Sequence, residues 1–164
     1  MSRAWVVGDN LDTDALAPGR YMKFGIEEIA KHCLESLRPE FAAAVRPGDL
    51  LVGGRNLGAG SSREQAPQAL RQLGIAAVVA PSFAGLFYRN ALNLGLPALV
   101  CAEAARIRDG DALELDLAAA TIRIVGSGTT LACEPIPDHL LAMLTDGGLL
   151  PHLEKRLARQ RASA

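Results

Sequence analysis

Residues Asn56 to Pro67 are the part of this chain whose residue types and spacing could do chemistry. They read Asn-Leu-Gly-Ala-Gly-Ser-Ser-Arg-Glu-Gln-Ala-Pro and lie between a short apolar run and a helical pattern. The first N–H groups of a helix lack partners within it and carry partial positive charge, so they can hold an anion. Gly58 and Gly60 let the backbone approach a ligand, and Arg63 adds a planar fork of donors that suits a carboxylate or phosphate. The stretch therefore predicts an anion-binding site.

The same residues also fit an ordinary helix start. Ser61 with Glu64, or Ser62 with Gln65, has the spacing of a capping box. A cap alone needs neither Gly-x-Gly before it nor an arginine in the first turn, where the helix dipole disfavours a cation. Such a conflict between local preference and sequence is typical of functional sites. Both interpretations stay open on local grounds.

Three known loop motifs fail on this stretch. A dinucleotide-binding fingerprint beginning at Gly58 would need a third glycine where the chain has Arg63. A P-loop beginning at Gly53 would need a lysine and a hydroxyl residue where the chain has Ala59 and Gly60. A nucleophile elbow would need a glycine two residues after a serine, and neither serine has one. Nucleotide binding and hydrolase chemistry of these types are therefore not expected.

Composition and charge narrow the function classes. With 164 residues, 49% of them apolar, the chain is long enough for one domain with its own core. A formal net charge of −1 gives no basic footprint for nucleic acid, and aromatic residues are too scarce for a base-stacking surface. No apolar run approaches the roughly 20 residues that span a bilayer, and the N-terminal residues lack the apolar segment of a signal peptide. We expect a cytoplasmic protein that binds neither nucleic acid nor membrane.

Cysteines and histidines are few and scattered. An odd, dispersed set of cysteines argues against a disulfide framework and against a zinc or iron–sulfur site made by this chain alone. Buried cysteine behaves as a small apolar residue, and we interpret the histidines as structural or surface residues. No metal site is expected in this chain, and a metal used in its chemistry would be held by a partner. The residues concerned are Cys33, Cys101, Cys133, His32, His139 and His152.

The elements around this stretch predict an α/β fold with a mostly parallel core sheet. Apolar runs at 4–8, 50–53, 75–80 and 96–101 are typical of buried strands, and helical spacing at 26–37, 41–45, 63–73 and 83–94 separates them. Their alternation implies right-handed crossovers. Alternating patterns at 112–117 and 121–125 predict a C-terminal hairpin, with a third strand at 129–133. Helices at 137–143 and 149–158 complete one domain over 1–164, with a tail expected to be disordered from about 160.

The loop after the first strand carries Asp12-Thr13-Asp14. One interpretation is an Asx-type turn, in which the carboxylates satisfy local N–H groups. The other is that two carboxylates so close together orient a catalytic group. The sequence alone does not choose between them.

The run Gly-x-Gly-Ser-Ser-Arg-Glu at 58–64 closely resembles the signature of the aconitase swivel-domain family. The resemblance covers the whole chain, through matches at 8–14, 20–21, 30–35, 82–84, 89–91 and 147–149 in the same order. It implies a single swivel-type domain with a compact β/β/α fold. As a free-standing chain it is similar to the small subunits of 3-isopropylmalate dehydratases and homoaconitase-type enzymes.

The resemblance implies a hydro-lyase that dehydrates a hydroxy acid and rehydrates it as a positional isomer. In such enzymes a large subunit carries a [4Fe-4S] cluster, and the small subunit closes over the substrate. By resemblance, Ser61 would be the base that removes a proton beside a carboxylate. Ser62 and Arg63, with Gly60 beside them, would bind a substrate carboxylate, and Asp14 would face the site.

The sequence also departs from the family pattern. Ala59 and Gln65 stand where relatives often carry cysteine and histidine, and we expect little loss of function from either. The loop Tyr21-Met22-Lys23-Phe24 is linked by resemblance to substrate choice, since an apolar residue there suits an isopropyl group and a cation suits an extra carboxylate. Lys23 is therefore either a solvated loop residue or a substrate contact.

Three functions follow from these observations. The leading one is the small subunit of a hydro-lyase that converts 2-isopropylmalate into 3-isopropylmalate in leucine biosynthesis, in complex with a cluster-bearing large subunit. A second is a homoaconitase-type or 2,3-dialkylmalate dehydratase small subunit, acting on another di- or tricarboxylic hydroxy acid. A third is a non-catalytic module that uses the loop only to bind an anion.

Overall fold

A seven-stranded sheet organises the chain, and a computed structural model describes its residues 1–163. The order in the sheet is β4-β3-β2-β1-β5-β6-β7. Four strands are parallel, β1 (Ser2–Val6), β2 (Leu50–Val52), β3 (Ala77–Ala80) and β4 (Ala98–Val100). Three are antiparallel to their neighbours, β5 (Ala112–Asp116), β6 (Thr121–Ile124) and β7 (Thr129–Ala132).

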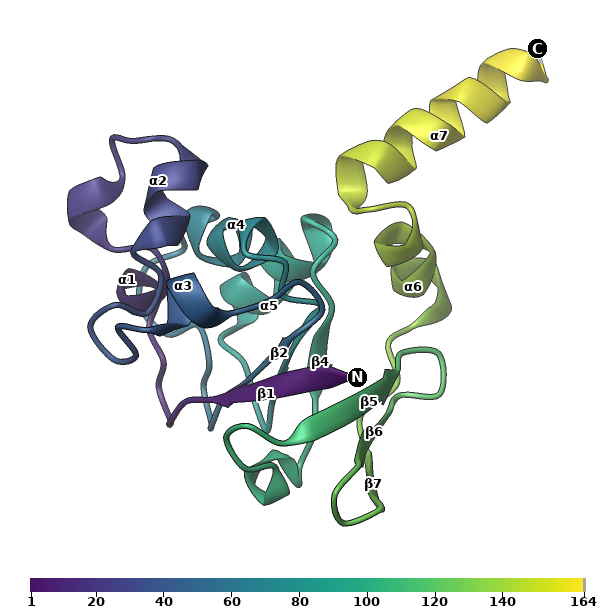
Figure 1. Cartoon of the computed structure of the whole chain (residues 1–164). Helices are drawn as coiled ribbons and strands as arrows, with labels where there is room; N and C mark the ends of the chain where they lie inside the picture. Colours follow the sequence, from purple (N-terminus) through teal and green to yellow (C-terminus); the bar gives the residue numbers. More distant parts are fainter. Residues whose placement is uncertain (164) are drawn as a thin grey trace.

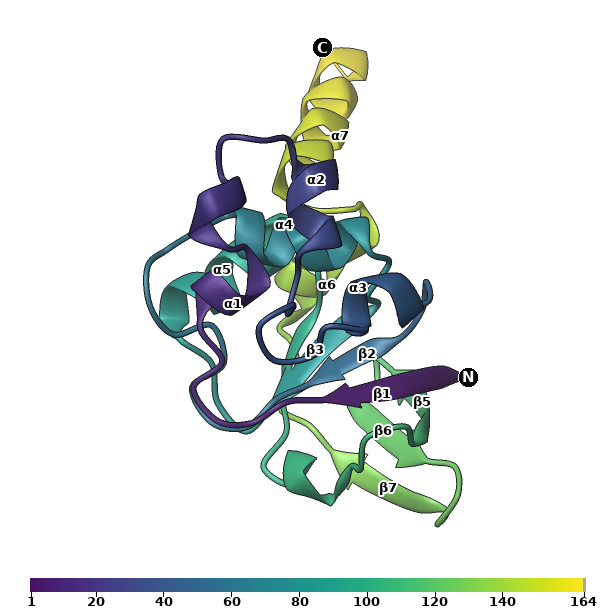
Figure 2. The same ribbon diagram turned by 60° about the vertical axis from the view of Figure 1, so that its left-hand side comes forward.

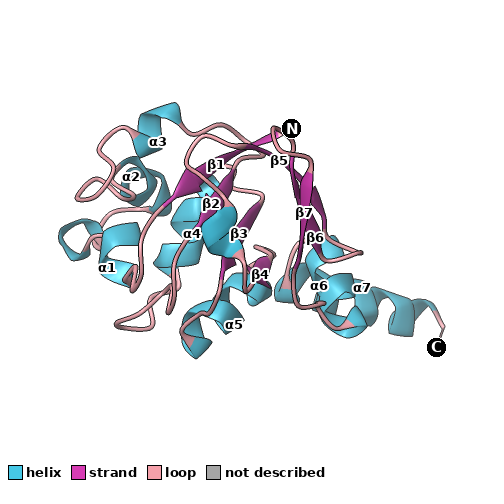
Figure 3. Ribbon diagram, turned by 90° about the horizontal axis from the view of Figure 1, so that it is seen from below, coloured by secondary structure: helices cyan, strands magenta, loops and turns pink. Residues whose placement is uncertain are grey.

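The strand order determines on which face of the sheet the helices lie. Because each crossover from β1 to β4 steps in the same direction, right-handed connections place their helices on one face of the parallel strands. Figures 1 and 3 show this layer, while the sheet arches so that β5, β6 and β7 turn away from it. The layer contains α1 (Thr13–Leu16), a 3-10 turn η1 (Gly19–Tyr21), α2 (Ile26–Lys31), α3 (Phe41–Ala44), α4 (Gln65–Gln72) and α5 (Gly85–Asn93).

The C-terminal helices pack against α5 of this layer. A short 3-10 turn η2 (Ala104–Arg106) precedes β5, and α6 (Asp138–Thr145) and α7 (Leu149–Ala162) follow β7. Figure 2 shows α7 extending away from the rest of the molecule. None of its residues is buried.

The core lies where the helix layer meets the parallel strands. Every residue of β2 and β3 is buried, which explains why their sequences are continuous apolar runs. Trp5 of β1 packs edge-on against Phe41 of α3, with ring centroids 5.1 Å apart. Its indole N–H donates to Asp49 Oδ2 at 3.0 Å, so the one polar atom of this ring is satisfied.

The predicted fold class is confirmed, with changes at element boundaries. The helix expected over 26–37 ends at Lys31 and continues as turns, with Leu34 at φ 61°. The helices expected from 63 and 83 begin at Gln65 and Gly85. The last helix continues to Ala162, past its predicted end at 158. Disorder of the final residues stays a prediction, and Ala164 lies outside the described residues.

Candidate active site

Three loops meet beyond the carboxyl ends of β1, β2 and β3. Backbone hydrogen bonds join them, from Gly58 N to Leu11 O at 2.7 Å, from Thr13 N to Ala59 O at 2.9 Å and from Leu57 N to Ser82 O at 3.1 Å. Ligands of open parallel sheets bind at this end, because loops from several strands converge there. The predicted anion-binding stretch therefore rests on neighbours far away in the sequence.

Ser61 and Ser62 are both exposed on these loops. The carbonyl of Ser61 accepts a hydrogen bond from Thr13 Oγ1 at 2.7 Å, and Thr13 is buried. The hydroxyl of Ser62 accepts one from Asn90 Nδ2 of α5 at 3.3 Å. The backbone at Ser61 is therefore anchored to Thr13, and among the described residues no hydrogen bond uses the exposed Ser61 hydroxyl.

The helix-cap interpretation of these serines is wrong. The helix α4 begins at Gln65, its N-cap is Glu64, and no side chain caps it. Within the described residues, no hydrogen bond uses the backbone N–H groups from Ser61 to Glu64. Arg63 precedes the helix, so it does not oppose the dipole from within the first turn. Four consecutive N–H donors are left available beside the two hydroxyls.

Glycine is required at positions 58 and 60 for different structural reasons. Both have positive φ, at 90° and 94°. A Cβ on Gly58 would lie 2.3 Å from the Phe87 side chain, so close packing on α5 requires glycine. A Cβ on Gly60 would come no closer than 3.5 Å to any neighbour, so only its backbone angle favours glycine. Gly60 is exposed and directly precedes Ser61.

Arg63 is bound to the protein through Nη1 only. Its Nη1 donates to Asp14 Oδ1 at 2.7 Å and to the Ala17 carbonyl at 3.0 Å. The same carboxylate accepts from Gly19 N at 2.9 Å, and Arg63 and this N–H hold the pKa of Asp14 below its ordinary value of 3.8. Among the described residues, nothing hydrogen-bonds to Arg63 Nε or Nη2. That edge of the guanidinium can receive a carboxylate side-on.

The Asp12-Thr13-Asp14 segment forms an Asx-type turn and also contacts the Ser61–Arg63 stretch. Asp12 Oδ1 accepts from Ala15 N at 2.8 Å and caps α1, as an Asx-type turn would. Asp14 binds Arg63 and Thr13 binds the Ser61 carbonyl, so the orientation of a catalytic group stays a prediction. The site list drawn from the sequence missed Thr13 and Asn90. Thr13 lies in the polar triplet at 12–14 and Asn90 in the family match at 89–91. Neither pattern shows that their side chains bond to Ser61 and Ser62.

Lys23 is not joined to these residues. It is exposed, its Nζ lies 5.3 Å from the centroid of the Phe24 ring, and no hydrogen bond or ion pair in the described part of the chain uses it. The loop itself is anchored, because Tyr21 stacks on His32 of the next segment with ring centroids 3.6 Å apart. The structure therefore brings Gly60, Ser61, Ser62, Arg63 and Asp14 together and leaves Lys23 on the surface.

Comparison with known proteins gives the family. The family model of the aconitase C-terminal domain matches residues 38–104. The homoaconitase small subunit of Methanothermobacter thermautotrophicus is 48% identical over 94% of this chain and 91% of that protein. A 3-isopropylmalate dehydratase small subunit of Archaeoglobus fulgidus is 48% identical over 92% of this chain and 94% of that protein. The chain belongs to this family of dehydratase small subunits.

A solved structure supports the same assignment. The crystal structure of the 3-isopropylmalate dehydratase from Methanocaldococcus jannaschii has a TM-score of 0.95 and 41% identity to this chain. The alignment covers 99% of this chain and 98% of that one. The predicted aconitase swivel-type domain is confirmed.

The small-subunit site is open to the surface. Shallow hollows flank it, one of about 340 Å³ along Gly8 to Asp12 and one of about 350 Å³ beside Glu64 and Asn90. In residues 1–163, no group of three or more His, Cys, Asp and Glu side chains is arranged to hold a metal ion. No helix described in the chain is long and apolar enough to cross a membrane.

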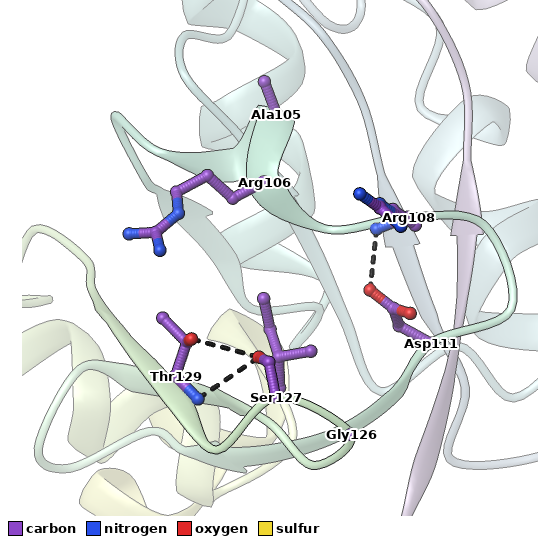
Figure 4. Close-up of a pocket in the computed structure, with 8 residues that line it drawn as sticks. Ala105, Arg106, Arg108, Asp111, Gly126, Ser127 and Thr129 are labelled. Carbon is purple, nitrogen blue, oxygen red and sulfur yellow. Dashed lines mark hydrogen bonds between the residues drawn. The ribbon is translucent and has the colours of Figure 1, made fainter.

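Another hollow, of about 580 Å³, lies away from this site, between η2 and the β6–β7 turn (Figure 4). Several of its polar groups hydrogen-bond to one another. Ser127 Oγ donates to Thr129 Oγ1 at 3.0 Å, and Asp111 accepts from Arg108 N at 2.8 Å. It shares no lining residue with the Ser61–Arg63 site.

Proposed function

We propose that this chain is the small subunit of a heteromeric hydro-lyase that isomerises 2-isopropylmalate to 3-isopropylmalate by dehydration and rehydration. The observation that carries the proposal is the exposed group of Ser61, Ser62 and Arg63, with free N–H donors, at the carboxyl ends of three parallel strands. Membership of the dehydratase small-subunit family gives that group its reaction class. We propose leucine biosynthesis as its pathway, because several relatives are named 3-isopropylmalate dehydratase small subunits.

Ser61 is the proposed base. A serine hydroxyl removes a proton only when its alkoxide is stabilised, because its ordinary pKa is far above neutrality. The unpaired N–H groups of Ser62 and Glu64 and the cation of Arg63 lie beside it in the chain and favour that anion. The bond from Thr13 to the Ser61 carbonyl fixes the backbone and leaves the hydroxyl free.

Arg63 is the proposed carboxylate clamp, with Ser62 and Gly60 beside it. Removing a proton next to a carboxylate builds negative charge on that carboxylate, which a bound guanidinium offsets. The free Nε–Nη2 edge suits a side-on carboxylate, while Asp14 and the Ala17 carbonyl hold the opposite corner. Asp14 thus binds the arginine that binds the substrate, and we propose that it acts on substrate through Arg63.

The rest of the active site is proposed to lie on a large subunit that carries a [4Fe-4S] cluster. Such a cluster would supply Lewis-acid activation of the hydroxyl that leaves. This chain contributes the base and the clamp on an open surface, and the partner's surface would exclude water from them. We propose a cytoplasmic location, because free cysteines such as these three persist in a reducing compartment.

The second candidate function is a homoaconitase-type or dialkylmalate dehydratase small subunit. Lys23 favours it, because an exposed cation on the loop after η1 could meet an extra carboxylate when the partner closes the site. Assays of the reconstituted enzyme with isopropylmalate and homocitrate separate the two. If Lys23 selects a tricarboxylate, Lys23→Val lowers activity on homocitrate and not on isopropylmalate.

Reconstitution tests the proposal. We expect the purified chain alone to be inactive. Mixing it with a cluster-bearing large subunit should give dehydratase activity. Ser61→Ala should then lower kcat by about 10²- to 10⁴-fold, the usual contribution of a general base, while the complex still forms. Ser127→Ala, an exposed serine in the β6–β7 turn, is the matched control and should change nothing.

Two results would contradict the proposal. Near-normal turnover by Ser61→Ala would remove Ser61 as the base. Anion binding by the free chain without activity alongside any cluster-bearing partner would instead support a non-catalytic binding module.

A further inference from the structure

The two edges of the sheet meet. The edge strands are β4 and β7, at opposite ends of the strand order. Glu134 N, just after β7, donates to Val100 O, the last residue of β4, at 2.8 Å. The arch of Figure 3 therefore closes at one point, where the chain leaving β4 touches the chain leaving β7.

A cysteine stands at this point on each side. Cys101 is the first residue after β4, and Cys133 is the first after β7. Hydrogen bonds fix both backbones, from Cys101 N to Ala80 O at 2.9 Å and from Cys133 N to Ala120 O at 2.8 Å. The Cys101 thiol donates to the Ala132 carbonyl oxygen at 3.7 Å, and the Cys133 thiol lies close enough to Cys101 to shift its pKa.

The two thiols differ in access and in acidity. Cys101 is fully buried, whereas Cys133 is partly exposed to solvent. The hydrogen bond from Cys133 lowers the pKa of Cys101 to about 7 despite its burial, and the same contact raises the pKa of Cys133. Cys33 is buried without such a partner, and burial raises its pKa. The pair therefore shares one thiolate near neutral pH, and Cys33 stays protonated.

We propose that Cys101 and Cys133 form a reversible disulfide site that is oxidised by low-molecular-weight disulfides such as oxidised glutathione. Cys133 passes its proton to Cys101 along their hydrogen bond and attacks one glutathione sulfur, which forms a mixed disulfide and releases one glutathione thiolate. Cys101 then loses a proton to solvent and attacks Cys133 Sγ, which releases the second thiolate. Starting from the state with one thiolate, the pair loses two electrons and one proton, and oxidised glutathione is reduced to two thiolates.

The bond would close the sheet covalently. It would tie the parallel strands that carry the Ser61 site to the antiparallel strands that lead into α6 and α7. It would also close a loop from residue 101 to 133, which restricts the unfolded chain and so raises the melting temperature. The hydrogen bonds between the three site loops involve neither cysteine. The disulfide is therefore expected to stabilise the fold without rearranging the Ser61 loops.

The test uses the full-length chain, first reduced and then incubated with oxidised glutathione at neutral pH. After alkylation of free thiols, mass spectrometry should find one alkylated cysteine, Cys33, and a 101–133 crosslinked peptide pair. Tm should rise by several degrees, and dithiothreitol should reverse both changes. Cys33→Ser is the matched control and should keep the crosslink, while Cys101→Ser should stop at a glutathione adduct on Cys133.

Other outcomes would overturn the proposal. One is that all three cysteines are still alkylated after prolonged oxidation. Another is a stable glutathione adduct on Cys133 of the unsubstituted chain. A third is a disulfide crosslink between two chains, seen on a non-reducing gel. Each can be read on the unsubstituted protein, so the test does not depend on the folding of a variant.

Discussion

At the scale of single residues, the Asp14–Arg63 ion pair decides how Arg63 can meet a carboxylate. Asp14 holds one corner of the guanidinium at 2.7 Å, and its own side chain is 65% exposed. We predict that Asp14→Asn raises KM of the reconstituted enzyme by about tenfold, because a hydrogen bond to a charged group is worth about 1.5 kcal/mol at its weaker end. The kcat should change less, since Ser61 keeps its own contacts.

Asp12→Asn is the control for this change. It makes the same substitution two residues away, and asparagine still caps α1. Its KM should stay at the unsubstituted value. A lower KM for Asp14→Asn would mean that Asp14 competes with substrate for Arg63 instead of orienting it.

Two neighbouring glycines offer a second prediction at this scale. Gly58→Ala combines positive φ with an overlap on Phe87, and we expect it to lower the free energy of unfolding by about 3 kcal/mol. Gly60→Ala has nearly the same φ but no overlap, so about 1 kcal/mol is expected. Urea unfolding of both variants measures the difference. Equal losses would mean that backbone angle alone, and not packing on α5, requires Gly58.

At the scale of elements, the sequence predicts what depends on local pattern and misses what depends on distant contacts. Continuous apolar runs located the parallel strands because both of their faces are buried. The start of α4 was misplaced by two residues because Thr13 and Asp14 hold Ser61 and Arg63 outside the helix. Those contacts span almost 50 positions, and capping-box spacing carries no information about them.

The β1–β2 junction gives a prediction at the element scale. Asp49, buried just before β2, accepts from Arg3 N at 3.2 Å, from Trp5 Nε1 at 3.0 Å and from Arg46 N at 2.9 Å. Asp49→Asn would turn an N–H₂ group toward these donors and leave at least one unsatisfied. We expect a loss of about 2–3 kcal/mol in the free energy of unfolding, measured by urea denaturation.

Asp116→Asn is the matched control for Asp49. Asp116 also accepts a backbone N–H, from Ala119 at 3.0 Å, but in an exposed turn. Asp116→Asn should lower the free energy of unfolding by no more than about 0.5 kcal/mol, as for most surface changes. Similar losses for both variants would show that burial does not distinguish the two carboxylates.

At the scale of the whole molecule, one feature was predictable and another was not. The swivel-type domain followed from several motifs in the right order along the chain. The closure of the sheet at Cys101 and Cys133 did not, since 32 positions separate these cysteines and neither lies in a motif. Scattered cysteines predicted three isolated apolar residues, but arching of the sheet brings two of them together.

Helix α7 extends from the domain with an apolar stripe facing solvent. Leu153 and Leu157 are 40% and 50% exposed, and no residue of this helix is buried. Because they contribute little to the core, Leu153→Gln with Leu157→Gln should shift Tm by no more than about 2 °C. Leu144→Gln on α6 is the matched control. Leu144 is buried, and a loss of about 2–4 kcal/mol there corresponds to roughly 5–15 °C. Scanning calorimetry of the free chain measures both, and a large shift in the double variant would mean that the face with Leu153 and Leu157 packs against the domain in solution.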